Sequence, residues 1–169
     1  MEQALQQLSL KTGEKINIRR GEFLAVSPDG HVGLYLHGNK IGVLVEINGG
    51  TSELASEVAM HVAASNPKYL ERANVAAADL NSEQDVYIAQ LKAQGKPENI
   101  IQNIVKGKLE KYYGEVCLTE QPFIKNEEVT VGKLLENAGA RAVRFIRFEL
   151  GDGIAKATND FAAEVAAQL

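Results

Sequence analysis

The sequence has a single cysteine, Cys117, among its 169 residues. One cysteine excludes a disulfide within the chain and any zinc centre built on several cysteines. The chain also lacks an apolar run long enough to cross a bilayer, and its N-terminus has no signal-peptide pattern. These features favour a protein of the reducing cytoplasm with no membrane association.

Positive charge is not in excess either, because the formal net charge is -4. A chain of this charge is not expected to bind nucleic acid or an anionic membrane through charge alone. Apolar residues make up 45% of the chain and charged residues 24%, which is ordinary for a globular protein. The length suffices for a buried core.

Motifs of the common catalytic classes are missing as well. The sequence contains no Walker A loop, no HExxH and no GxSxG. Of the three histidines, His61 lies on an apolar helical stripe and has no metal-ligating residue four positions later, so we interpret it as structural. His31 begins a predicted strand beside a turn and is expected to be solvated. We therefore expect no catalytic residue, no metal site and no cofactor.

The pattern of apolar residues predicts an α+β fold. Residues 16–26 alternate in polarity, and residues 31–37 and 41–47 follow as two more strands joined by short turns. Three such strands predict an antiparallel meander. A short helix capped by Thr130 and a strand over residues 141–150 are predicted near the C-terminal end of the core.

Helical spacing is clearest over residues 52–65, with Thr51 or Gly50 as the N-cap and Pro67 as the stop. One face of this predicted helix carries only small side chains, which would let it lie close to a sheet: Ala55, Ala59 and Ala63.

A helical hairpin is predicted after a connector at residues 74–79. Asn81 is expected to begin its first helix, Gly95 to end it and Pro97 to begin the second, whose apolar face runs from Ile100 to Tyr112. The resulting division is an α+β core of residues 1–80 and 114–157, an inserted coiled-coil hairpin of residues 81–113 and a C-terminal helix of residues 158–169.

Two exposed candidates for contact with another protein come from local pattern. His37 and Gly38 lie at the predicted hairpin tip, where a partner contact and a plain solvent-exposed turn are equally compatible with the spacing. Phe123 and Ile124 form an apolar pair within a polar loop, and such a pair either tucks into its own core or anchors a partner.

Seven segments, in order along the chain, are similar to a known family: GEKINIRR, YLHGNKIGVLVEI, AMHVAASNPKYL, GKPENI, GEVCLTEQPFIKNEEVTVGKLL, FIRFELGDGI and NDFAAEVAA. Together they resemble the C-terminal half of bacterial elongation factor Ts. The resemblance implies a guanine nucleotide exchange factor of translation elongation that binds elongation factor Tu in the cytoplasm. Such a factor acts allosterically, so it performs no chemical step and needs no cofactor.

The resemblance also implies what this stretch of the family plan leaves out. The helical N-terminal domain and the first core half, which carries a Thr-Asp-Phe-Val signature, are expected to be missing. Ser52 and Glu53 stand where the first half would have its Asp-Phe wedge. We therefore expect the main exchange device to be absent from the chain.

The partner-binding residues implied by the resemblance fall in four places. Thr12, which departs from the family's residue, and Gly13 match one contact pair, and the YLHG histidine with its glycine matches another. A loop residue pair after QPF matches a contact with the third domain of the GTPase, and the last helix a contact with its nucleotide domain. The full set is Thr12, Gly13, His37, Gly38, Ile124, Lys125, Phe161 and Val165. The rival interpretation is a non-catalytic dimerisation or protein-assembly module, with a homodimer as the simplest assembly.

Overall fold

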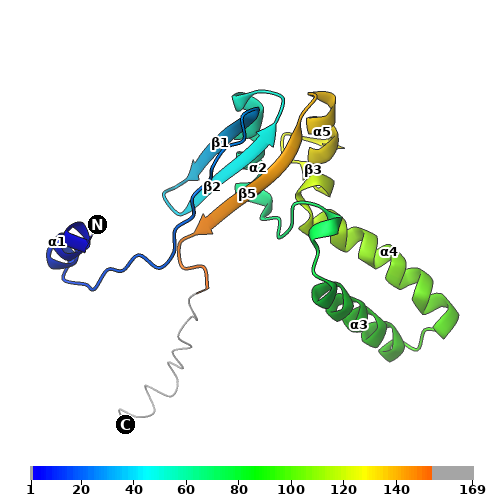
Figure 1. The fold of residues 1–169 in the computed structure, drawn as a ribbon. Coiled ribbons are helices and arrows are strands. Elements are labelled where there is room, and N and C mark those ends of the chain that lie inside the picture. The colour runs from blue at the N-terminus through cyan, green and yellow to red at the C-terminus, as the bar shows by residue number, and fades with distance from the viewer. Residues whose placement is uncertain (1, 154–169) are drawn as a thin grey trace, which may run out of the picture.

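The computed structural model describes residues 2–153, and Figure 1 shows a three-stranded sheet backed by a helix, with a long helical hairpin standing off to one side. The α+β fold class is thereby confirmed. The elements in chain order are α1 (Glu2–Thr12), β1 (Gly30–His37), β2 (Ile41–Asn48), α2 (Ser52–Ser65), η1 (Arg72–Asn74), α3 (Ala77–Ala93), α4 (Glu98–Val116), η2 (Leu118–Glu120), β3 (Pro122–Phe123), β4 (Asn126–Thr130), α5 (Val131–Asn137) and β5 (Arg141–Glu149).

The main sheet is antiparallel, with strand order β1-β2-β5. Between β1 and β2 the chain reverses through Gly38 and Asn39, whose φ values are 52° and 56°. Two consecutive positive φ angles are typical of the primed hairpin turns, whose twist matches that of the strands that they join. This local chemistry sets the register that pairs His37 with Ile41, and it leaves Val43, Val45 and Ile47 buried on one face of β2.

The third strand, β5, joins β2 from a distant part of the sequence, with Val45 opposite Phe145. A buried carboxylate stands at this junction. Glu46 is 2% exposed and accepts hydrogen bonds from Ser27 N (2.9 Å), Ser27 Oγ (2.5 Å) and Arg144 Nε (3.0 Å). The hydrogen bonds from Ser27 hold the pKa of the Glu46 carboxyl below its usual range despite its burial. Glu46 of β2 thus ties the chain before β1 to β2 and to β5.

Helix α2 covers the buried face of the sheet. The predicted N-cap is confirmed, because Thr51 Oγ1 accepts a hydrogen bond from Leu54 N at 3.2 Å. The alanine stripe faces the strands, and Ala55 and Ala59 are fully buried. A Cβ at Gly33 of β1 would overlap the backbone of Ala55 and Ser56. The helix therefore approaches the sheet closely enough to require glycine on the strand.

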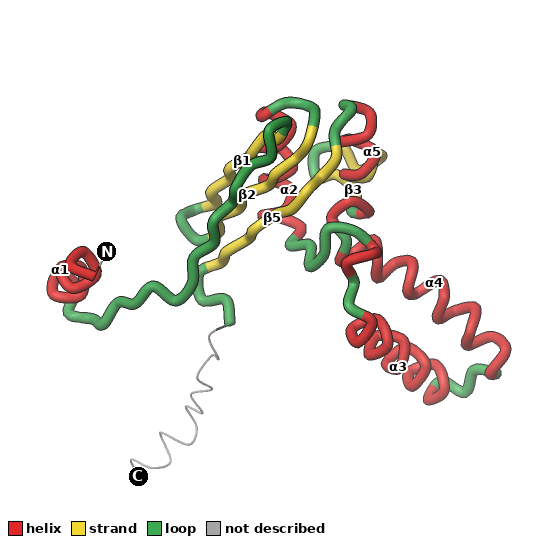
Figure 2. Tube along the Cα trace, in the orientation of Figure 1, coloured by secondary structure: helices red, strands yellow, loops and turns green. Residues whose placement is uncertain are grey.

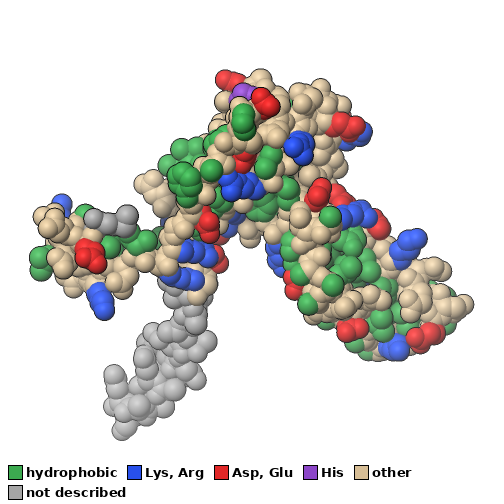
Figure 3. All heavy atoms as spheres, in the orientation of Figure 1, with side chains coloured by type: hydrophobic (Ala, Val, Ile, Leu, Met, Phe, Trp, Pro, Cys, Tyr) green, Lys and Arg blue, Asp and Glu red, His purple; other side chains and the backbone are tan. Residues whose placement is uncertain are grey.

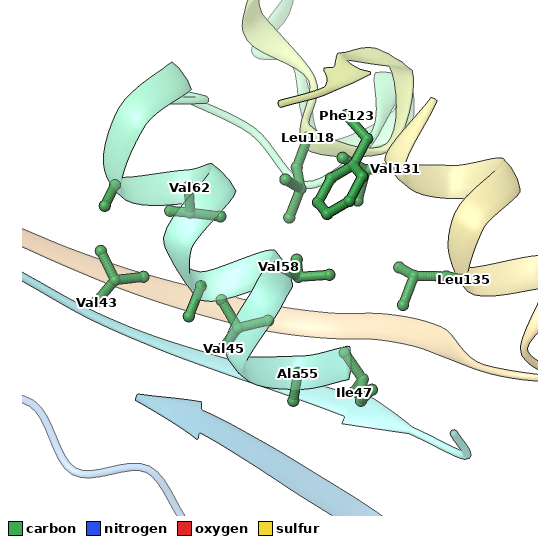
Figure 4. Packing of buried hydrophobic residues seen from close by; sticks show 12 residues of the cluster. Val43, Val45, Ile47, Ala55, Val58, Val62, Leu118, Phe123, Val131 and Leu135 are labelled. Atoms are coloured by element: carbon green, nitrogen blue, oxygen red, sulfur yellow. The ribbon is translucent and has the colours of Figure 1, made fainter. Parts of the chain in front are cut away.

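A second group of buried apolar side chains packs against a flank of α2 and forms a second apolar layer of the core. Leu118, Phe123, Val131 and Leu135 come from η2, β3 and α5, and Figure 4 shows them gathered beside Val58 of α2. All four side chains are at most 3% exposed. Helix α2 is thus apolar on two sides, which explains why its apolar stripe is wider than a single sheet contact needs.

The helices α3 and α4 form the predicted hairpin, with Gly95 (φ 70°) just past the end of α3. Its outer part has a small core of its own, made by Leu91, Ile101 and Val105. Its base has another, in which Tyr112, Val116 and Cys117 contact side chains of the preceding connector. Figure 3 shows hydrophobic side chains filling the space between the two helices.

Charged contacts at the base of the hairpin centre on Arg72, which pairs with Glu110 and Glu120 and lies 4.5 Å from the ring centroid of Tyr113. Arg72 and Glu110 are about half exposed. Exposed pairs of this kind contribute roughly 0–1 kcal/mol each, whereas one buried large apolar side chain contributes about 1.5–3 kcal/mol. The base cluster of apolar residues therefore holds the hairpin in place more strongly than the ion pairs do.

The predicted first strand is wrong, because residues 16–26 form no strand. The segment is held by other contacts, near its middle and near its C-terminal end. Arg20 pairs with Asp152, and Ala25 O accepts a hydrogen bond from Arg144 Nη2. The sheet's third position is taken by β5 on the far side of β2, so the alternation in this segment does not reflect strand pairing.

Four further expectations need correction. Helix α3 begins at Ala77, which places Asn81 inside the helix, and α4 continues through Gly114 to Val116. Ile100 is 43% exposed and does not belong to the buried face. The polar loop after the hairpin contains η2 and the two-stranded β3–β4 sheet, coloured yellow in Figure 2. The predicted C-terminal helix of residues 158–169 lies outside the described residues.

No helix within residues 2–153 combines the length and the apolar character needed to cross a membrane.

We expect Gly33→Ala to lower the free energy of unfolding by roughly 1–3 kcal/mol, because the added methyl group must push α2 away from the sheet. Chemical denaturation followed by circular dichroism measures the change. Gly107→Ala is the matched control. Gly107 lies exposed within α4 with open space around its Cβ position, so the same change should stabilise the protein by about 0.5–1 kcal/mol. Equal effects at the two sites would contradict the close contact.

Candidate functional site

The first predicted contact site is the turn between β1 and β2. His37 is exposed, and its Nδ1 lies 3.2 Å from the hydroxyl of Tyr35, with the two rings stacked at a centroid distance of 6.1 Å. Tyr35 packs against the main core. The imidazole is therefore held in place by a partly buried tyrosine while it remains open to solvent.

Apolar surface surrounds this turn. An open hollow of about 440 Å³ beside it is lined mainly by Leu36, Ile41, Phe148 and Leu150. Leu34 and Leu36, on the face of β1 that α2 does not cover, are 59% and 63% exposed. Figure 3 shows hydrophobic side chains gathered over this end of the sheet. An oriented histidine next to exposed apolar surface is suited to contact with another protein.

The second predicted site is the two-residue turn between β3 and β4, formed by Ile124 and Lys125. The structure places the two members of the apolar pair in different environments. Phe123 is 3% exposed and belongs to the core, whereas Ile124 is 46% exposed. Lys125 Nζ pairs with Glu57 Oε1 of α2 at 2.8 Å. One member of the pair anchors the turn, and the other is presented to solvent.

A buried histidine lies directly beneath this turn. His61 of α2 is fully buried, and its Nδ1 lies 3.2 Å from the backbone nitrogen of Ile124. Its Nε2 lies 3.0 Å from Oε1 of Gln121, and Gln121 is itself 4% exposed. The Gln121 amide nitrogen is 2.6 Å from the carbonyl oxygen of Glu115 and 3.4 Å from that of Ser65.

These contacts determine the tautomer of His61. Carbonyl oxygens only accept hydrogen bonds, so the amide nitrogen of Gln121 must face them and its Oε1 must face His61. His61 Nε2 then carries the proton, and the free lone pair of Nδ1 accepts from Ile124 N–H. Burial lowers the pKa of the His61 imidazole, against a weaker opposing effect of its hydrogen bond with Gln121. The neutral ring is therefore favoured, as the bond to Ile124 requires. The prediction that His61 is a structural residue is in keeping with this.

Thr12 and Gly13 lie at the end of α1, which Figure 1 places well away from the sheet. Thr12 Oγ1 donates to Leu8 O at 3.0 Å, and Gly13 takes a φ of 73°. Within the described residues no side chain of α1 is buried. An open hollow of about 920 Å³ separates the helix from residues 13–17. Phe161 and Val165 lie outside the described residues.

The described candidates thus occupy three separate surfaces and form no common pocket within residues 2–153. This arrangement resembles a set of docking points more than a catalytic centre. The same part of the chain contains no cluster of three or more histidine, cysteine or acidic side chains that could hold a metal ion. Ser52 and Glu53 occupy the first turn of α2, where Ser52 Oγ lies 3.3 Å from His31 Nδ1.

The family model for elongation factor TS matches residues 1–152. The chain belongs to the elongation factor Ts family. Elongation factor Ts of Pseudomonas paraeruginosa is 51% identical over 99% of this chain and 58% of its own length. The Azotobacter vinelandii protein shows the same identity and coverage, and that of Methylococcus capsulatus is 47% identical over all of this chain and 57% of its own. The chain therefore spans somewhat more than half the length of these curated relatives.

The match to the elongation factor Ts family confirms the resemblance seen in the sequence. It covers the α1 end, the β1–β2 turn and the β3–β4 turn, but not Phe161 and Val165. The partner-binding role of individual residues stays a prediction.

Sequence reasoning missed Gln121, which joins three elements. Its side chain contacts His61 of α2 and the Glu115 carbonyl of α4, and its carbonyl oxygen accepts from Val131 N at the start of α5. The one signal in the sequence is His61 on an apolar helical stripe. A buried imidazole needs polar partners, so this position predicts that some polar side chain contacts it. That signal does not say where along the chain the partner lies.

We expect the stability of the protein to fall as the pH is lowered from about 6.5 towards 5. The folded state lowers the pKa of His61, so in this window the unfolded chain binds more protons and acid favours unfolding. One such group changes the free energy of unfolding by at most about 1.4 kcal/mol per pH unit. Denaturation series at several pH values measure the slope. His61→Gln should flatten it, and an unchanged slope in that variant would contradict the assignment.

Proposed function

We propose that the chain binds elongation factor Tu and forms part of the factor that promotes exchange of its bound GDP for GTP. The observation that carries this proposal is the family match over residues 1–152. The geometry supports it, because His37 and Ile124 are exposed side chains on tight, well-anchored turns. Such a factor would act in the cytoplasm, where translation elongation takes place.

Exchange of this kind follows from linkage alone. If the chain binds the nucleotide-free GTPase more tightly than the GDP complex, it lowers the affinity of the GTPase for GDP by the same factor. No bond is made or broken by the exchange factor itself. Rigid docking points suffice, because each has only to favour one conformation of the partner over another.

We further propose that the chain lacks the main exchange device of the family. Ser52 and Glu53 take the place where the first core half would carry its Asp-Phe pair, so the first turn of α2 offers a hydroxyl and a carboxylate but no aromatic wedge. The chain should therefore dock on the GTPase through its turns without forcing nucleotide out efficiently.

We expect the purified chain to bind elongation factor Tu with modest affinity and to accelerate GDP release only slightly. Binding is measured by calorimetry with nucleotide-free elongation factor Tu, and release by stopped-flow fluorescence of a labelled GDP. Absence of any binding would overturn the proposed function. Exchange as fast as that of a full-length relative would show that this stretch of sequence needs no aromatic wedge.

The variant that tests the contact surface is His37→Ala. His37 is exposed, so its truncation should leave the melting temperature nearly unchanged. If the imidazole is a central contact, affinity should fall roughly tenfold or more. Gln102→Ala, at an exposed position of α4 outside the candidate contact surfaces, is a suitable control.

We further propose that the helical hairpin folds as a unit separate from the α+β core. The outer cluster of Leu91, Ile101 and Val105 makes no use of core residues, whereas the base cluster joins the hairpin to the connector at Tyr69 and Val75. We therefore place the boundary between the two units within the hairpin, between the base cluster and the outer cluster, and not at Asn81 and Gly114.

We expect the core to stay folded when residues 86–108 are replaced by a short glycine-serine linker, because the base cluster and the Arg72 pairs are kept. Loop closure costs little at this length. Thermal unfolding followed in the near ultraviolet should remain cooperative. A matched deletion of residues 78–115, which removes Tyr112 of the base cluster, should lower the melting temperature further. Loss of cooperative unfolding in the shorter deletion would show that the hairpin belongs to the core.

An assembly module is the second candidate function. One observation favours it, namely that Leu34 and Leu36 are exposed on the uncovered face of the sheet, next to the unpaired edge of β1 within the described residues. Sedimentation of the chain over a range of concentrations distinguishes a homodimer from a monomer that binds elongation factor Tu.

A further inference from the structure

The β3–β4 turn is fastened to α2 at two points that lie one helical turn apart. Glu57 pairs with Lys125 at the surface, at 2.8 Å, and His61 accepts from the Ile124 amide in the interior, at 3.2 Å. Phe123, next to Ile124, adds an apolar anchor whose ring lies 5.8 Å from the imidazole of His61. The turn has only two residues, so these attachments leave its backbone little freedom.

Among these attachments, the bond from Ile124 N–H to His61 Nδ1 acts on the exposed residue itself. Glu57 and Lys125 are 41% and 50% exposed, so water competes with their ion pair. His61 is fully buried and water cannot replace it as the acceptor. An amide deprived of that acceptor would turn towards solvent, and the Ile124 side chain would change direction with it.

We propose that His61 is a positioning residue, which fixes the Ile124 backbone so that the exposed Ile124 side chain is presented to the partner GTPase. This inference rests on the proposed function. In this role, Gln121 sets the tautomer of His61, and that tautomer leaves Nδ1 free to accept the hydrogen bond from the Ile124 amide. His61 does not touch the partner.

Two substitutions separate the two hydrogen bonds of the ring. Asparagine carries an acceptor oxygen near the place of Nδ1, so His61→Asn can keep the bond from Ile124 N–H and loses the one to Gln121. Glutamine places its amide near Nε2, so His61→Gln can keep Gln121 and loses the acceptor for Ile124. Both variants remove a ring from the same buried site, which makes each the control for the other.

Affinity for nucleotide-free elongation factor Tu is measured for both variants at a temperature well below their melting transitions. We expect His61→Gln to bind roughly fivefold more weakly than His61→Asn, even where its melting temperature is equal or higher. In an Ile124→Ala background the difference between the two variants should vanish, because His61 then has no contact side chain to position. Equal affinity of the two variants, or a difference that persists without Ile124, overturns the proposal.

A measurement on the unaltered chain tests the hydrogen bond on which the proposal depends. Nitrogen-15 NMR of the histidine rings should show the His61 Nδ1 unprotonated and hydrogen-bonded to the Ile124 amide. A protonated Nδ1 overturns the proposal. Failure of the proposed function gives a different result, because neither the unaltered chain nor His37→Ala would then bind the GTPase. Binding that His37→Ala weakens, and that both His61 variants leave intact, refutes the positioning role alone.

Discussion

The close approach of α2 to the sheet is the constraint on which the rest of the structure depends. Gly33 leaves room for the backbone of Ala55, and the alanine stripe lets the helix lie almost on the strands. Because α2 sits this deep, a flank of the helix also remains within the core and is covered by the second apolar layer. The β3–β4 turn belongs to that layer, so the position of Ile124 depends on the contact between Gly33 and Ala55 at the sheet-facing side of the helix.

Buried polar groups connect the layers that apolar contacts bring together. Glu46 joins the segment before β1 to β2 and β5, and the His61–Gln121 pair joins α2 to α4, α5 and the β3–β4 turn. Hydrophobic contacts alone tolerate sliding, whereas a buried carboxylate or imidazole stabilises the fold only when its partners are in place. These two groups therefore specify one relative placement of the elements.

The parts of the fold that depend on neighbouring residues could be predicted from the sequence. The caps at Thr51 and Thr130 and the turn at Gly38 are examples, because their chemistry is complete within a few positions. Pairing between distant segments could not be predicted in this way. Alternation in residues 16–26 gives no information on whether a strand edge is free to receive them, and a buried histidine does not identify Gln121. The exposed candidates His37 and Ile124 were found by pattern and resemblance, but the contacts that orient them were not.

The pairing of β2 with β5 has a consequence for the synthesis of the protein. All of α2, the hairpin and the second apolar layer lie between these two strands in the sequence. During translation β1, β2 and α2 can form early, but the open edge of β2 has no partner until the end of β5 has left the ribosome. The end of β5 lies about 100 residues beyond the end of β2, so at roughly 5–20 residues per second this edge stays exposed for about 5–20 s. The hairpin can fold in microseconds once made, and it then shortens the flexible loop that β5 must close. Besides the outer edge of β1, the nascent chain is thus open to aggregation or to a chaperone at this edge of β2 for a predictable time.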